Sequence, residues 1–481
     1  MKRYQAAIIT IALSLFIALI TLAIADNRQL LGLIYLLFLS VITLVILKMV
    51  AARMGIWSLG GIFICSTWIY YASPFLSIAL FSGARTFDWA NLSSTNLTEL
   101  GWYCLIVCSG TITFFLAWHA MLKRASRLRQ PIKTDDRILL PDYVKIAAIP
   151  LIVIGAALCL KLYSNMGGMS VYSRLYYVQF ARQLRGLGVY AAGYNLATSG
   201  LAMLYAWGTQ RRRLWPSIVC AAVGLFIFLP SLLIGDRSPV FSLISSLLIA
   251  HHLFVHKISL PKIALLGLVF AFSMMIVGNL RSVATNIGWQ NAVKILSLRD
   301  LRASMDPMNS EFGTAPLILI RITRDFREVG SWLAGRTLLD DVLNVVPGSI
   351  WPNRPNPPSV WFSSFYSPLY YSQGGAYGFS WLAEGYMNLG LMGVLILGLL
   401  LGIIFGSIDA RSDRNYLVAL IVTVMAPLAF TMSRNDLSAL LKPGLVIQVV
   451  PVLICIGCGW MLFQVRESGG TPLPGKHTID G

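Results

Sequence analysis

The sequence predicts an all-α polytopic membrane protein of about 12 transmembrane helices with one large extracytoplasmic loop. Of its 481 residues, 57% are hydrophobic and only 12% are charged, whereas about a quarter of the residues of a soluble domain are charged. Apolar stretches of about 17 to 25 residues recur along the chain, and a helix satisfies its own backbone hydrogen bonds in a bilayer. Lysine and arginine also concentrate in alternate connections, and together these three observations exclude a soluble globular protein.

The predicted spans fall into two groups, separated by one long connection. Nine precede it, at residues 6–25, 30–50, 56–80, 100–122, 146–163, 187–207, 214–234, 240–256 and 263–278. Three follow it, at residues 382–408, 416–432 and 444–463. The chain is therefore predicted to consist of transmembrane helices 1–9 with short loops over residues 1–278, a large periplasmic loop over 279–381, helices 10–12 over 382–465, and a disordered cytoplasmic tail over 466–481.

The charge distribution predicts the orientation of these spans, because short cytoplasmic connections are rich in lysine and arginine. With both termini in the cytoplasm, the inner side carries 20 cations and 7 acids, and the outer side carries 18 cations and 13 acids. The first span follows Met-Lys-Arg without a cleavage site, so we expect it to be retained as a helix. All seven cysteines fall within predicted spans, so no disulfide framework is implied.

Aromatic residues gather in the predicted outer loop, where prolines alternate with tryptophan, phenylalanine and tyrosine between residues 347 and 371. Trp351 and Trp361 are our candidates for contact with a substrate, because aromatic faces stack on the apolar CH faces of sugar rings. The alternative is an ordinary aromatic belt at the membrane interface. The cluster as a whole therefore favours a carbohydrate substrate.

The outer cations are mostly arginine, which accounts for 15 of the 18. A planar guanidinium binds phosphate or carboxylate oxygens in a bidentate manner, and lysine does not. Arg324 is one candidate, in a short apolar and then basic segment at residues 315–328 that predicts a helix. The alternative is that Arg321 pairs with Asp325, and Arg324 with Glu328, as solvated i,i+4 ion pairs on that helix.

Charges at the outer ends of spans are stronger candidates, because a charge at that depth is costly to desolvate. These are Asp236 and Arg237 after the seventh span, Arg281 after the ninth, Glu384 at the start of the tenth, and Arg434 and Asp436 after the eleventh. Three arginines at that depth suit the binding of a lipid-linked diphosphate, and a carboxylate beside them suits the role of proton acceptor. The alternative is local pairing of Asp236 with Arg237, or arginines that extend to lipid headgroups.

Histidine is not available for this chemistry, because all five histidines map to the predicted inner side. They also provide no outer ligand for a metal, so we predict neither a metal site nor a cofactor. Glu384 is the leading candidate for the general base. Behind it stand Asp236, Glu311, Asp325 and Asp436. Separately, Gly398, Gly402 and Gly406 form a stripe of small residues that predicts the close approach of a neighbouring helix.

Several segments together resemble the O-antigen polymerase (Wzy-type) family. They are the Gly-Asp-Arg-Ser sequence at 235–238, the aromatic loop, the entry to the tenth span at 380–393, and Ser433-Arg434. The resemblance covers most of the chain and implies a metal-independent, lipid-linked glycosyltransferase of lipopolysaccharide biosynthesis. This enzyme would polymerise undecaprenyl-diphosphate-linked oligosaccharide repeat units into O-antigen or a similar surface polysaccharide, on the periplasmic side of the bacterial inner membrane.

The resemblance also implies roles for individual residues. Arg237, Arg281 and Arg434 would hold the lipid diphosphate, Glu384 would be the base, and Tyr386 and Asn388 would line the acceptor side. Implied partners are the lipid-linked oligosaccharide, membrane lipids and a chain-length regulator protein, with no role for nucleic acid.

Two other functions remain open at this point. A transporter or flippase would share a layout of twelve spans with both termini inside, although the chain shows no half-length repeat and its charges lie at span ends. An O-antigen ligase is the second alternative. That family is thought to rely on an outer histidine, which this sequence lacks.

Overall fold

A computed structural model describes most of the chain. The described residues are 35, 39, 57–81, 86–87, 90–91, 95–127, 139–168, 180, 183–184, 187–234, 236–259, 306–309, 311–348 and 350–468. Outside these residues lie the first and ninth predicted spans, the second apart from residues 35 and 39, Arg281 and most of the predicted tail.

Seven helical stretches are long and apolar enough to cross a membrane: Leu59–Ala79, Thr98–Ala125, Tyr143–Asn165, Trp215–Leu232, Trp381–Ser412, Tyr416–Arg434 and Leu437–Val465. They coincide with predicted spans 3, 4, 5, 7, 10, 11 and 12, and they confirm an all-α polytopic membrane protein. The eighth predicted span is the shorter apolar helix α11 (Ser238–Phe254), and the sixth is the largely buried helix α9 (Gly188–Gln210). The total of twelve stays a prediction.

The helices differ from the predicted spans mainly at their ends. The first stretch contains α3 (Leu59–Tyr71) and α4 (Ser73–Phe81), and it is followed by α5 (Leu97–Arg127), α6 (Tyr143–Asn165) and α10 (Trp215–Ile234). After the loop come α19 (Trp381–Ser412), α20 (Tyr416–Thr431), the 3-10 turn η4 (Met432–Arg434), α21 (Leu437–Ala439), the π-helix η5 (Leu440–Val449) and α22 (Val450–Ser468). α19 therefore extends four residues beyond the predicted end of its span.

Glycines allow close contacts between described helices of the bundle. A Cβ atom built on Gly402 of α19 would lie 2.4 Å from the Phe114 carbonyl oxygen of α5, and one built on Gly398 would lie 2.8 Å from the Gly110 oxygen. The predicted role of the Gly398, Gly402 and Gly406 stripe is thereby confirmed, because a larger residue would push α5 away. α6 and α9 approach each other in the same way at Gly155 and Gly193.

Helix α19 is broken near its start. Leu389 (φ −143°, ψ 27°) and Gly390 (φ 59°, ψ −144°) leave the helical conformation, and only glycine adopts this combination at Gly390 without strain. A Cβ atom on Gly393 would lie 2.0 Å from the Gly385 carbonyl oxygen, so the two halves touch across the kink. Residues 381–388 consequently form a separate half-helix.

The described part of the predicted loop contains four helices and two 3-10 turns. These are η2 (Pro307–Asn309), η3 (Glu311–Gly313), α15 (Thr314–Val329), α16 (Arg336–Leu343), α17 (Pro358–Tyr366) and α18 (Pro368–Ser372). α15 is the helix expected at 315–328, and its apolar first half is buried against α5 and α19. The β-structure of the described residues is one antiparallel pair, β1 (Thr86–Phe87) and β2 (Ala90–Asn91), in register Thr86↔Asn91.

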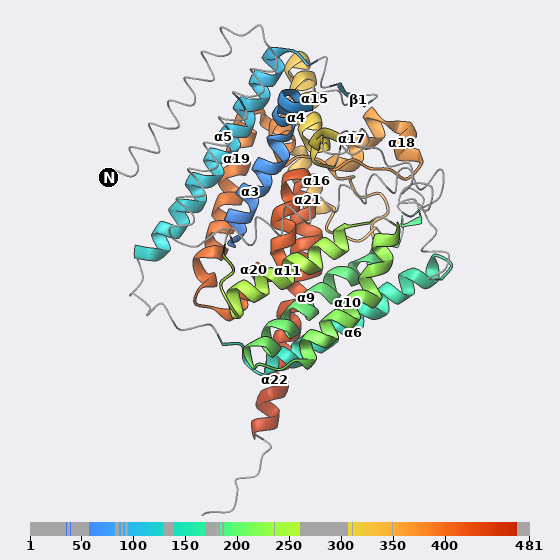
Figure 1. The fold of residues 1–481 in the computed structure, drawn as a ribbon. Helices are drawn as coiled ribbons and strands as arrows, with labels where there is room; N and C mark the ends of the chain where they lie inside the picture. The colour runs from blue at the N-terminus through green and yellow to red at the C-terminus, as the bar shows by residue number, and fades with distance from the viewer. Residues whose placement is uncertain are drawn as a thin grey trace, which may run out of the picture.

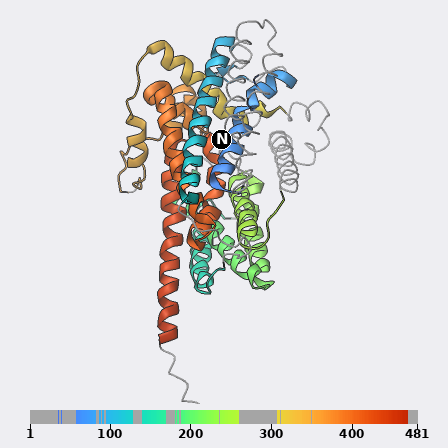
Figure 2. The same cartoon turned by 90° about the vertical axis from the view of Figure 1, so that its left-hand side faces the viewer.

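Both ribbon views place this loop segment at one end of the bundle. Figure 1 shows α15, α17 and α18 around the start of α19 at the top, with α22 leaving at the bottom. Figure 2, turned by 90°, shows α22 extending past the other helices at the end opposite to the loop segment. We call the end where α19 begins and α20 ends the site end.

Candidate catalytic site

Glu384 lies at the site end, on the half-helix formed by residues 381–388. Ser380 caps this half-helix, since its hydroxyl accepts a hydrogen bond from the Ala383 amide at 3.1 Å. The Glu384 side chain is fully buried. One carboxylate oxygen accepts a hydrogen bond from the Thr337 hydroxyl at 3.2 Å, and the other accepts one from the Leu437 amide at 2.9 Å. Segments of α19, α16 and α21 therefore converge on one carboxylate.

Asn388 supports this arrangement from the next turn of the half-helix. Its amide nitrogen donates to the Thr337 hydroxyl at 2.6 Å and to the Glu384 carbonyl oxygen at 2.8 Å. Since the Thr337 oxygen receives the Asn388 hydrogen bond, the Thr337 hydroxyl proton is directed to Glu384. The three side chains form an ordered relay of donors that ends on Glu384.

The loop covers the end of the half-helix. The amides of Leu333 and Ala334 donate to the carbonyl oxygens of Met387 and Asn388 at 3.0 and 2.9 Å. The kink at Gly390 frees these carbonyls from the continuing helix, and the loop supplies the donors that they need. The break in α19 thus joins the loop to the site.

Two further acids meet Glu384. Asp341 of α16 is fully buried, and it lies one helical turn after Thr337, which brings its carboxyl next to that of Glu384. Asp436, also buried, accepts hydrogen bonds from the Ser359 amide at 3.0 Å and the Ser438 hydroxyl at 2.5 Å. Burial raises the pKa of Asp341 far above its ordinary value, and the negative charges of Glu384 and Asp436 raise it further. Three carboxyl groups therefore share one buried region.

Two cations lie at the C-terminal end of α16. Lys442 of the π-helix η5 and Arg354 both donate to the carbonyl oxygen of Asn344, at 3.3 and 2.8 Å. Positive charge at a helix C-terminus is favourable, because the carbonyl ends of the peptide dipoles meet there. These cations hold α16, and with it Asp341, against the bundle.

Arg434 and Arg237 lie at the same end of the bundle as Glu384. Arg434 precedes Asp436 by two residues, and its carbonyl oxygen lies 2.8 Å from a Cβ built on Gly378. Arg237 stands at the start of α11, and one turn later the Phe241 ring packs on Phe430 at 4.9 Å, one turn before Arg434. The seventh and eleventh predicted spans thus end close together, and the convergence of the span-end charges on one site stays a prediction.

Arg324 has acidic partners in the structure. Its guanidinium lies 3.5 Å from the Asp325 carboxylate and 4.0 Å from that of Glu99. Arg321 forms the expected i,i+4 pair with Asp325 at 2.8 Å and lies over the Tyr366 ring, 5.1 Å from its centre. The expected i,i+4 pairing is therefore present for Arg321, although the pair is mostly buried against Tyr366, whereas Arg324 contacts Glu99 and Asp325.

The predicted aromatic residues fall into separate groups. Trp361 stacks on Phe365, with ring centres 5.8 Å apart and planes at 13°. Trp351 is 38% exposed. Tyr386 is buried at the kink, where its ring meets Trp332 edge to face at 5.2 Å. Only Tyr386 of these three shares the half-helix of Glu384, so the structure divides the predicted sugar contacts between the loop and the kink.

The sequence interpretation gave no role to Thr337, Asp341, Arg354 or Lys442. The available signal was weak: Thr337, Asp341 and Asn344 recur at helical spacing, so that their polar side chains share one face of α16. An acid on the buried face of a short helix is unusual enough to be noticed. Its proximity to Glu384, 43 residues away, is not readable from the sequence.

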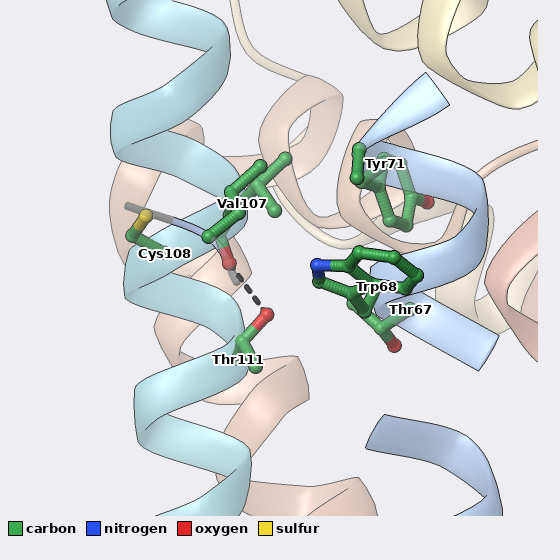
Figure 3. Close-up of a pocket in the computed structure, with 8 residues that line it drawn as sticks. Thr67, Trp68, Tyr71, Val107, Cys108 and Thr111 are labelled. Carbon is green, nitrogen blue, oxygen red and sulfur yellow. Dashed lines mark hydrogen bonds between the residues drawn. The ribbon is translucent and has the colours of Figure 1, made fainter. Parts of the chain in front are cut away.

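A small pocket lies elsewhere, between α3 and α5. Its lining includes Thr67, Trp68, Tyr71 and Thr111, and none of the three acids contributes to it. In Figure 3 the Thr111 hydroxyl donates to its own helix at Val107, at 2.7 Å. The Tyr71 hydroxyl connects this region to the site by hydrogen bonds with Ser380 and the Ser433 carbonyl, each 2.7 Å. The residues that line this pocket include no carboxyl or imidazole group that could act as a general base.

The fold and the site together define a polytopic membrane protein with a buried acidic site at one end of its helix bundle. The family model described as O-antigen polysaccharide polymerase Wzy matches residues 6–464. The chain belongs to this family, which confirms the resemblance noted in the sequence. No curated protein and no solved structure matches the chain. Within the described residues, no group of three or more His, Cys, Asp or Glu side chains is placed to hold a metal ion.

Proposed function

We propose that this polymerase acts on undecaprenyl-diphosphate-linked oligosaccharide repeat units at the periplasmic face of the bacterial inner membrane. Membership of the Wzy family supports repeat-unit polymerisation. The observation that carries the proposal is the convergence of α16, α19 and α21 on Glu384, beside the segment that bears Arg434. The excess of cations on the opposite side supports cytoplasmic termini and a periplasmic site end.

In the proposed reaction, a hydroxyl of the acceptor repeat unit attacks the anomeric carbon of the donor glycan. Glu384 takes the hydroxyl proton, and the bond between the anomeric carbon and the diphosphate oxygen breaks with its electron pair on oxygen. Arg237, Arg281 and Arg434 stabilise the lipid diphosphate as it leaves. These carboxylate and guanidinium groups supply acid-base and electrostatic catalysis without a metal.

Access to Glu384 requires a movement of the loop. The carboxylate is fully buried beneath Thr337 and the Leu437 amide, so a sugar hydroxyl reaches it only when α16 moves away. We propose that binding of the glycan to the loop aromatics Trp351 and Trp361 drives this opening. Tyr386 and Asn388 then line the acceptor side, and membrane lipids and a chain-length regulator are the expected partners.

The test is deletion of the gene followed by gel analysis of the surface polysaccharide. A polymerase predicts single repeat units on the lipid core, restored to long chains by the wild-type gene. Full loss of surface polysaccharide, with lipid-linked units retained inside the cell, would instead identify a flippase. Polymer of normal length left unattached to the lipid core would identify a ligase.

A flippase is the second candidate because of the break in α19. Discontinuous helices form the substrate sites of many transporters, where they lie near the middle of the membrane. Here Leu389 and Gly390 follow the start of a 32-residue helix by only eight residues, so the break lies near one end of the helix. This position favours a site at the membrane surface, as glycosyl transfer between two lipid-linked glycans requires.

A further inference from the structure

We propose that Asp341 is a positioning residue for Glu384: it remains protonated and donates its carboxyl hydrogen to the Glu384 carboxylate. This inference deepens the proposed function and rests on it for the role of Glu384 as base. It assigns to the loop helix α16 a direct part in setting the charge of the site.

The geometry requires a shared proton. Asp341 and Glu384 are both fully buried, and Asp341 lies one helical turn after Thr337, whose hydroxyl donates to Glu384 at 3.2 Å, so the two carboxyl groups are neighbours in one buried region. Two carboxylates at such a distance cannot both be ionised, because like charges in a buried region repel strongly. Neither Asp341 oxygen receives a hydrogen bond of normal geometry from a donor in the described residues. A proton between the two groups is the element that completes this pair.

The neighbouring donors decide which carboxyl is ionised. Glu384 receives the Thr337 hydroxyl on one oxygen and the Leu437 amide on the other, and both hydrogen bonds favour its charged form. For Asp341, only the nearby Ser438 backbone favours the charged form. Burial and the two neighbouring acids disfavour it. The proton therefore belongs on Asp341, and its hydrogen bond gives Glu384 a third donor.

The surrounding charges agree with this assignment. The charged groups that face Asp341 are both acids: Glu384 of α19 and Asp436, which immediately precedes α21. The cations Lys442 and Arg354 are held by the Asn344 carbonyl oxygen at the end of α16. Asp340 is the one other acid of α16, and its side chain is only partly buried. The immediate partners of Asp341 thus make a negative charge on it costly.

This pairing has a consequence for the reaction cycle. Before transfer, the pair holds one proton, on Asp341, and one negative charge, on Glu384. When α16 moves to admit the acceptor hydroxyl, Asp341 leaves Glu384 and keeps its own proton, so Glu384 loses a donor and becomes a stronger base. Glu384 then takes the hydroxyl proton and releases it to water before α16 returns, which couples the strength of the base to the position of the loop.

Infrared spectroscopy of the purified full-length protein tests the proposal without substrate. A protonated carboxyl group has a carbonyl stretch separate from that of carboxylates, and hydrogen–deuterium exchange shifts it. We expect this band in the wild type at pH 7 and its loss in Asp341→Asn, whereas the matched control Asp340→Asn retains it. If Asp341→Asn removes only a carboxylate band, Asp341 is ionised and the proposal is overturned.

The pH dependence of polymerisation by purified protein gives an independent test. Loss of a donor to ionised Glu384 raises the pH of the acidic limb, so Asp341→Ala is expected to shift it upward by about one pH unit. Asp341→Asn, which can still donate an N–H, is expected to shift it by less than half as much. A downward shift in Asp341→Asn, or a uniform loss of rate without a shift, would overturn the inference. Full activity of Glu384→Gln would instead refute the proposed base, whatever the infrared result.

Discussion

Two buried acids on the same helix, Glu384 and Asp409, have opposite surroundings. They lie near the two ends of α19, and both are fully buried. Asp409 accepts hydrogen bonds from the amides of Leu59 and Gly60 at 2.8 and 2.9 Å, and from the Trp118 indole at 2.7 Å. Glu384 accepts hydrogen bonds from the Thr337 hydroxyl and the Leu437 amide, and two other carboxyl groups lie beside it.

The difference separates a structural acid from a candidate catalytic one. At Asp409, a negative charge meets the N-terminus of α3, where free amides and the helix dipole favour it. Its side-chain hydrogen bonds come from donors on α3 and α5, so the carboxylate ties α3, α5 and α19 together. At Glu384, the neighbouring carboxyl groups of Asp341 and Asp436 add an electrostatic cost that packing alone does not require, and such arrangements are typical of functional sites.

The largest expected effect follows from removing the charge of Glu384. Glu384→Gln keeps the size of the side chain but eliminates the base, so polymerisation is expected to fall by about a hundredfold or more. The measurement is chain length on gels and the rate of chain growth with purified lipid-linked repeat units. Membrane insertion must remain at the wild-type level for the comparison to be valid. Undiminished chain growth in this variant would show that Glu384 is not the base and would leave both acids with a structural role only.

The corresponding change at Asp409 is expected to affect stability. Asp409→Ala leaves two amides and one indole N–H without their acceptor, which is expected to lower the free energy of unfolding by about 3 kcal/mol. Thermal unfolding in detergent measures this loss. The folded fraction should retain the wild-type rate of chain growth. A variant that stays equally stable but polymerises poorly would place Asp409 in the catalytic machinery instead.

The pH dependence of stability distinguishes the two regions further. The pKa of Asp341 is raised in the folded protein, so the folded state binds the extra proton above the ordinary pKa of about 4. Stability contributed by this group is therefore full below that pH and falls as pH rises, by up to about 1.4 kcal/mol per pH unit. Asp341→Asn is expected to become progressively more stable than the wild type between pH 5 and pH 9.

Chemical unfolding at a series of pH values provides this measurement. Asp340→Asn serves as the control, because it removes a neighbouring acid that is only partly buried. A stability difference between Asp341→Asn and the wild type that is independent of pH would contradict a raised pKa at Asp341.

The smallest effect is expected at Arg324. Its partners Asp325 and Glu99 already occupy the guanidinium, which is about a third exposed, and exposed ion pairs contribute at most about 1 kcal/mol. Arg324→Lys should leave chain growth within about twofold of the wild type. A loss comparable to that of Glu384→Gln would show that Arg324 contacts the diphosphate and would extend the site along α15.

Much of the fold was predictable because it depends on composition over long windows. Spans of apolar residues identify membrane helices, whatever their partners, and the spacing of Gly398, Gly402 and Gly406 predicts a close helix contact. Helix ends were less predictable. The tenth span continues to Ser412, because Asp409 satisfies buried donors and so remains within the helix.

The site was predictable only in part. Glu384 stands out in sequence as a charge at the start of an apolar span, and Asn388 lies one turn later on the same half-helix. Arg324 was a weaker candidate from sequence, and the structure gives it acidic partners. Whether an arginine is available for substrate depends on which acids reach it, and Glu99 comes from a helix 225 residues earlier.

The sequence by itself determined the class of protein, the approximate spans and the leading acid, because hydropathy and charge act locally along the chain. Tertiary structure decided which acids meet. Asp341 and Asp436 come from segments on either side of α19 in sequence, and only the break at Gly390 and the loop folded over it bring them to Glu384. The charge state of a carboxyl group depends on its neighbours in space, and those neighbours are set by long-range packing.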